Sequence, residues 1–93
     1  MGLFKDKDLK NLENSILAAK VMFKMGTSGA IKPEKLPALV VKSGNDILPN
    51  AQRLSAKGKR AEAIEALRTQ RLEGADGFSV NFNDLMEQVI EKL

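Results

Sequence analysis

The stretch that decides the fold is residues 9–25, LKNLENSILAAKVMFKM. Its apolar residues recur at spacings of three and four, which predicts an α-helix from Asp8 to Met25 with one continuous apolar side. That side consists of Leu9, Leu12, Ile16, Ala19 and Phe23. Asp6 or Asp8 can cap the start of this helix, and Gly26 is well placed to end it.

A second apolar group lies on roughly the opposite side of the same helix. Its members are Ala18, Val21, Met22 and Met25. The charged strip between the two apolar sides is narrow and consists of Glu13, Lys20 and Lys24. A helix that is apolar on two sides is usually buried centrally or shared between subunits. We therefore predict a partner interface made of Leu12, Ile16, Ala19, Met22, Phe23 and Met25.

Glycines and prolines divide the next part of the chain. We expect a loop over residues 26–37, where two prolines follow the sequence Gly-Thr-Ser-Gly. A short helix then covers residues 37–43 and ends at Gly44. Val40 and Val41 leave a short strand as the alternative for this segment.

Two further helices are expected in the second half of the chain. Asp46 is a favourable N-cap for a helix over residues 47–57, with Pro49 in its first turn, where the missing amide costs nothing. Gly58 breaks that helix, and the next one covers residues 59–73 and ends at Gly74.

The last segment is expected to begin with a short extended stretch over residues 78–82, because its apolar residues alternate. Asn81 or Asn83 would then cap a C-terminal helix. The apolar side of that helix consists of Leu85, Met86, Val89, Ile90 and Leu93. The fold expected for residues 1–93 is a single all-α domain, a compact bundle of four to five helices.

The composition excludes most catalytic chemistry. The chain has 15 Lys and Arg residues against 12 Asp and Glu, a formal net charge of +3, and neither His nor Cys. Acid–base catalysis near neutral pH most often uses His, and zinc sites are built mainly from His and Cys. Glu62 and Glu65 are neighbours on one helix, where such a pair is usually solvated surface. We therefore expect no enzymatic activity, no cofactor and no metal site.

Six basic residues gather in the middle of the chain. They are Arg53, Lys57, Lys59, Arg60, Arg68 and Arg71. On the helix over residues 59–73 the arginines flank the apolar side instead of opposing it. One interpretation is that their long stems cover apolar surface while the charged ends reach water. The other is contact with nucleic acid or an anionic ligand, because the guanidinium group matches phosphate and carboxylate.

Residues 51–67 resemble the middle of a tetratricopeptide repeat. The matching positions are Leu54, Gly58, Ala63, Ile64 and Leu67. The family's large residue before the turn, its second small residue and its closing proline are missing. The resemblance covers less than a third of the chain, and one such hairpin cannot form a solenoid. The resemblance implies a helical hairpin with its turn at Gly58 and a role in peptide binding.

These observations favour a non-enzymatic protein-interaction module, an adaptor or regulatory protein that acts as a homo-oligomer. At this length the burial of apolar surface roughly balances the entropy lost on folding, so a partner surface adds stability. Met22, Met25 and Met86 supply the adaptable apolar surface that partner-binding faces favour, and ordinary filling of the core is the alternative role for each of them. Binding of nucleic acid or an anionic ligand through residues 53–71 is the alternative. Charges begin at Lys5 and no apolar run is long enough for a membrane span, so we expect a cytoplasmic protein.

Overall fold

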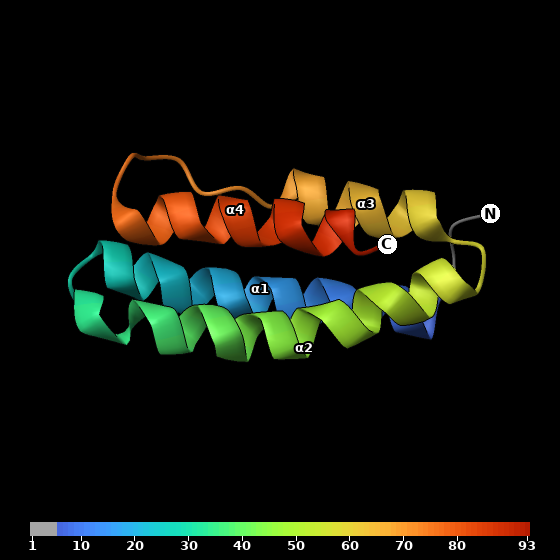
Figure 1. Ribbon diagram of the computed structural model, residues 1–93, viewed down its shortest axis with the longest axis horizontal. Helices are drawn as coiled ribbons and strands as arrows, with labels where there is room; N and C mark the ends of the chain where they lie inside the picture. Colours follow the sequence, from blue (N-terminus) through green and yellow to red (C-terminus); the bar gives the residue numbers. More distant parts are fainter. Residues whose placement is uncertain (1–5) are drawn as a thin grey trace.

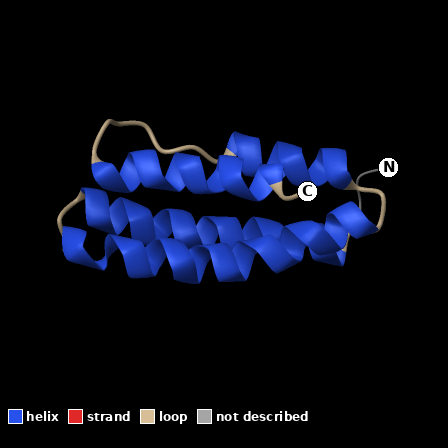
Figure 2. Cartoon of the chain, viewed as in Figure 1, coloured by secondary structure: helices blue, strands red, loops and turns tan. Residues whose placement is uncertain are grey.

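The computed structural model describes residues 6–93; Lys5, on which part of the expected cytoplasmic location rests, lies outside this range. The described chain forms four α-helices and one 3₁₀ turn: α1 (Lys7–Thr27), η1 (Pro33–Lys35), α2 (Leu36–Ala56), α3 (Arg60–Thr69) and α4 (Gly77–Glu91). Figure 2 shows helices and loops but no strand in residues 6–93. The prediction of an all-α bundle of four to five helices is confirmed.

The helices form two layers (Figure 1). α1 and α2 lie side by side as an antiparallel hairpin, and α3 and α4 lie together across one side of that hairpin. Each helix runs opposite to the one before it. One side of the α1–α2 hairpin therefore faces the core, and the other side faces away from it.

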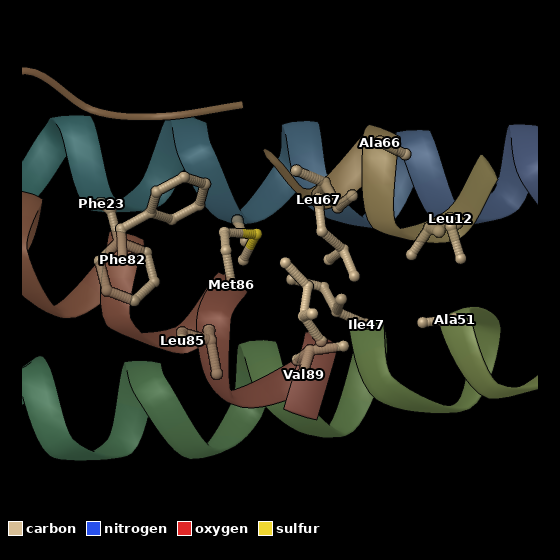
Figure 3. Packing of buried hydrophobic residues seen from close by; sticks show 14 of the residues in the cluster. Leu12, Phe23, Ile47, Ala51, Ala66, Leu67, Phe82, Leu85, Met86 and Val89 are labelled. Atoms are coloured by element: carbon tan, nitrogen blue, oxygen red, sulfur yellow. The ribbon is translucent and has the colours of Figure 1, made fainter. Parts of the chain in front are cut away.

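The core lies between the two layers (Figure 3). Phe23 of α1 contacts Phe78 and Phe82 of α4 edge to face, with ring centroids 6.5 Å and 5.4 Å apart. The buried apolar residues are Leu12, Ile16, Ala19, Phe23, Leu39, Ile47, Ala51, Leu54, Ala63, Ala66, Leu67, Leu72, Phe78, Phe82, Leu85, Met86, Val89 and Ile90. All four helices contribute to this cluster, so the first apolar side of α1 is covered by the chain itself.

The start of α1 agrees with the prediction, whereas its end does not. Asp6 caps the helix by accepting a hydrogen bond from the backbone N–H of Asp8 at 2.8 Å. Gly26 does not end the helix, because it is itself helical and buried. It lies so close to the Phe78 ring that a Cβ atom at this position would overlap the ring. The positive φ that follows the helix belongs to Gly29, at +90°.

α2 is one continuous helix where two shorter helices were predicted. Gly44 ends no helix and Asp46 caps none, because both lie inside α2. The alternative of a strand over residues 37–43 is also wrong. Buried residues recur along one side of the whole helix: Leu39, Ser43, Ile47, Ala51 and Leu54. Burial of this continuous stripe outweighs the cost of an interior glycine and proline.

Pro49 lies in the interior of α2 and not in a first turn. An interior proline removes a backbone hydrogen bond and usually bends the helix. The carbonyl that loses its helical donor is that of Asn45, four residues before Pro49, while the side-chain amide of Asn50 donates to the next carbonyl, that of Asp46, at 3.0 Å. Figure 1 shows the last turns of α2 rising toward α3, as such a bend would allow.

Gly58 makes the turn between α2 and α3, as predicted, with a φ of +81°. α3 is shorter than expected, because it ends at Thr69 and not at Glu73. The segment after it is held by Asn83, whose side-chain amide pairs with the backbone N–H and carbonyl of Leu72 at 3.0 Å and 2.9 Å. These two bonds replace the helical bonds that an extended α3 would have made.

α4 begins earlier than expected, and the extended stretch predicted over residues 78–82 is helical. Asp76 is the N-cap, and its carboxylate accepts a hydrogen bond from the backbone N–H of Ser79 at 3.2 Å. The expected caps, Asn81 and Asn83, lie inside the helix. The prediction failed because Phe78 and Phe82 satisfy a helical spacing of four as well as an alternating one.

Candidate protein interface

The side of α1 that faces away from the core carries large apolar side chains. Leu17 is 47% exposed, Val21 57%, Met22 41% and Met25 40%. Ala18, between them, is exposed as well. Residues four apart are neighbours on a helix surface, so Leu17, Val21 and Met25 form one row. We call these five residues the outer face of α1.

Only two of the six residues predicted for a partner interface belong to this face. Met22 and Met25 are exposed, whereas Met86, which was also expected to supply surface for a partner, is fully buried in the core. The other four are buried among the helices of the same chain: Leu12, Ile16, Ala19 and Phe23. Leu12, Ile16 and Phe23 have no exposed surface to offer a partner in this fold, so their assignment to an interface is corrected. Ala19 keeps only 5% of its surface exposed, at the groove between α1 and α2. Leu17 was missed, although its spacing of four from Val21 was the signal that could have found it.

A groove of about 510 Å³ runs between α1 and α2 beside the outer face of α1. Small side chains such as Ser15, Ala18 and Ser43 line it, together with Met22 and Leu39. Its polar and charged lining comes mainly from α2: Lys42, Asn45, Asp46, Asn50 and Arg53. The groove and the outer face share Ala18 and Met22, so they form one continuous surface.

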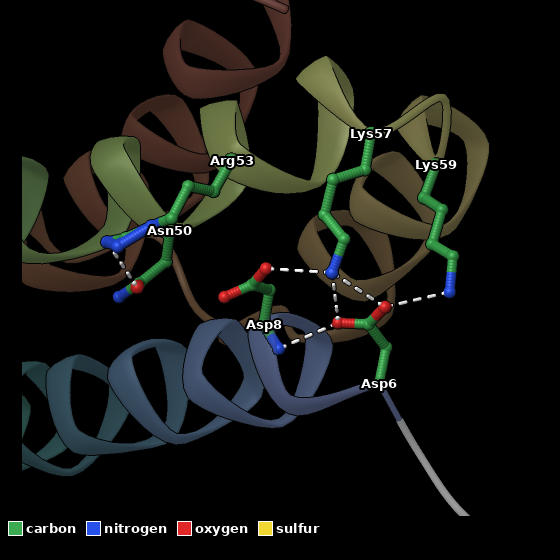
Figure 4. Close-up of polar contacts among 6 residues, drawn as sticks. All are labelled: Asp6, Asp8, Asn50, Arg53, Lys57 and Lys59. Atoms are coloured by element: carbon green, nitrogen blue, oxygen red, sulfur yellow. Dashed lines mark hydrogen bonds and ion pairs between the residues drawn. The ribbon is translucent and has the colours of Figure 1, made fainter.

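The structure divides the predicted basic cluster. Lys57 contacts Asp6 and Asp8 at 2.9 Å each, and Lys59 contacts Asp6 at 2.8 Å (Figure 4). These pairs join the start of α1 to the connection between α2 and α3. The ammonium groups of Lys59 and Lys57 hold the pKa of the Asp6 carboxyl well below its usual range. Both lysines are therefore partly neutralised within the chain.

The other four cations of the cluster have different surroundings. Arg71 forms an ion pair with Glu87 of α4. Arg53 donates to the side-chain oxygen of Asn50 at 3.1 Å and lines the groove between α1 and α2. The last two are exposed on α3: Arg60 and Arg68. The six cations therefore do not act as one patch.

Asp76 has a structural role at the start of α4. The Asp76 carboxylate accepts hydrogen bonds from the hydroxyls of Ser79 at 2.7 Å and Thr27 at 3.0 Å. The pKa of the Asp76 carboxyl is lowered, mainly because the Ser79 hydroxyl donates a hydrogen bond to its ionised form. Glu62 and Glu65 line a shallow groove that also includes Glu13. Within residues 6–93 no three His, Cys, Asp or Glu side chains are grouped so that they could hold a metal ion.

None of the helices in residues 6–93 has both the length and the apolar character needed to cross a membrane. Comparison of the chain with protein-family models, curated proteins and solved structures finds no match.

Proposed function

We propose that this chain is a non-enzymatic protein-interaction module, an adaptor or regulatory protein that docks through the outer face of α1. The observation that carries this proposal is the exposure of four large apolar side chains in one continuous patch: Leu17, Val21, Met22 and Met25. Contiguous apolar patches on small soluble proteins commonly mark interaction sites. The lack of His and Cys in the sequence also argues against a catalytic role.

Self-association is the form of this function that can be tested without knowing a partner. A specific interface buries about 800 Å² on each side. Four partly exposed side chains on one helix offer only a few hundred Å², roughly the size of a single surface patch. We therefore expect a weak homo-oligomer that forms reversibly as the protein concentration rises.

Light scattering coupled to gel filtration tests this, over a range from about 10 μM to about 1 mM, where weak complexes become populated. The mean mass should rise with concentration for the wild type and stay at one protomer for Val21→Lys. The matched control is Val80→Lys, because Val80 is 43% exposed but lies on α4. A wild type that remains one protomer at the highest concentration contradicts self-association.

Binding of nucleic acid or an anionic ligand through residues 53–71 is the alternative proposal. Its support is Arg60 and Arg68, which are exposed on the same helix. The ion pairs of Lys57 and Lys59 with Asp6 weigh against this alternative, because they leave these two lysines less free to bind an anion. Binding of this kind should weaken steeply with salt and should be lost when Arg60 and Arg68 are replaced by Ala. Unchanged binding after that replacement would remove the alternative.

A further inference from the structure

Positive charge is concentrated on the layer that carries the candidate interface. Residues 7–56, which span α1 and α2, hold eight Lys and Arg against four Asp and Glu. Residues 57–93, which include α3 and α4, hold six against seven. The excess charge of the chain therefore lies on the hairpin, and the other layer is nearly neutral.

Two of these cations lie where they can bracket a bound segment. Lys42 and Arg53 both line the groove on its α2 side. They are eleven residues apart, which corresponds to about 16 Å along a helix. Lys24 is exposed on α1, close in sequence to Met22 and Met25. The groove has one carboxylate in its lining, Asp46.

The shape of the surface suits a helix. Ala18, Ala19 and Ser43 are small, so they allow another backbone to approach closely, and Met22 and Leu39 provide apolar contact on either side. An amphipathic helix that inserts its apolar side into such a groove is a common mode of recognition. We propose, building on the function proposed above, that the partner is an amphipathic helix with acidic residues along its edges, which lies between α1 and α2.

Charge complementarity distinguishes this partner from a second copy of the chain. In a homodimer through this layer, each copy would bring its own lysines and arginines toward those of the other, and this repulsion would keep the self-association expected above weak. Acidic edges would instead face Lys42 and Arg53. Nucleic acid would satisfy the cations but would leave Met22 and Val21 without apolar contact.

Fluorescence anisotropy with labelled peptides tests the proposal. The probes are two synthetic helical peptides with the same Leu and Ala apolar side, one with Glu along both edges and one with Lys, and a scrambled form of the Glu peptide. The Glu-edged peptide should bind at least about ten-fold more tightly than the other two, because only it matches both the groove and its charge. A short DNA duplex serves as the nucleic-acid probe.

Charge reversal makes the test specific to the groove. Lys42→Glu combined with Arg53→Glu should weaken the Glu-edged peptide at least about five-fold and improve binding of the Lys-edged peptide. The matched control is Arg60→Glu with Arg68→Glu, which changes the net charge equally but lies on α3, and it should alter affinity less than about two-fold.

Several outcomes would overturn the inference. Equal loss in both double variants would show that only net charge matters. Equal binding of the scrambled peptide would show that no groove is used, and tight binding of the duplex alone would assign the surface to phosphate. If the wild type self-associates and Val21→Lys does not, but no peptide binds, the acidic-helix proposal fails while the interaction module stands. A protein that neither self-associates nor binds any probe refutes both.

Discussion

Replacing Gly26 with Ala should destabilise the protein, although the same change in most helices stabilises it. An alanine in a helix interior is about 1 kcal/mol more favourable than a glycine. Gly26 is the second-last residue of α1, so the gain there is smaller than this value. A Cβ atom at Gly26 would overlap the ring of Phe78, and atoms cannot remain that close.

The overlap can be relieved only by movement of a well-packed side chain. Phe78 is 5% exposed and contacts Phe23 edge to face. Overpacking of a core typically costs about 1–3 kcal/mol, and expulsion of a phenylalanine costs a similar amount in lost burial. After subtraction of the propensity gain, we expect a loss of about 1–2 kcal/mol in the free energy of unfolding. That corresponds to a decrease in Tm of roughly 5–10 °C for a domain of this size.

Gly44→Ala is the matched control, because it makes the same chemical change inside α2. A Cβ atom there would lie 3.4 Å from Cδ1 of Leu85, which is ordinary contact. It should therefore stabilise the protein by about 0.5–1 kcal/mol. Urea unfolding followed by circular dichroism at 222 nm measures both variants. A Gly26→Ala protein more stable than the wild type would refute the reasoning. In a Phe78→Ala protein the ring is absent, so Gly26→Ala should no longer lower the free energy of unfolding, and an unchanged loss there would also refute it.

Three further changes test other contacts. Asp6→Asn keeps a good N-cap but removes the charge that pairs with Lys57. Because the pKa of Asp6 is lowered in the folded state, its ionised carboxylate stabilises the fold above the unfolded pKa of about 4, and this stabilisation is lost as the pH falls further. When the midpoint of urea unfolding is measured against pH, it should therefore fall less steeply in acid for Asp6→Asn than for the wild type. Asn83→Ala removes both hydrogen bonds to the backbone of Leu72 and should lower the free energy of unfolding by about 2 kcal/mol. The Leu72 amide should then exchange its hydrogen faster, and an unchanged exchange rate would contradict this prediction. Pro49→Ala restores a backbone donor inside α2 and should raise Tm, with a gain of up to about 3 kcal/mol; a lower Tm would show that the bend of α2 is required.

Local signals in the sequence predicted the features that local physics controls. The spacing in residues 9–25 identified α1, Asp6 was one of two candidate caps, and Gly58 was identified as a turn. The predictions failed where tertiary contacts override local preference. Gly44 and Pro49 look like boundaries in sequence, yet a buried stripe carries α2 past both.

The contacts that join distant parts of the chain left no local signal. Lys57 and Asp6 are 51 residues apart in sequence, and neither is unusual in its own segment. The same is true of Gly26 and Phe78, whose close approach depends on how α4 crosses α1. Such pairs become visible only when the packing of the helices is known, and this is why the basic cluster was expected to act as one patch.

Periodicity located both apolar sides of α1, and the architecture decides which one is covered. In two layers of helices, α3 and α4 can cover only one side of the α1–α2 hairpin. The covered side of α1 contributes Leu12, Ile16 and Phe23 to the core, each with no exposed surface. On the outward side Val21 adds little to folding, because it buries little area and valine is a weaker helix former than lysine. The fold itself therefore does not require an apolar side chain at Val21, and the docking proposed above would give this side chain a contact.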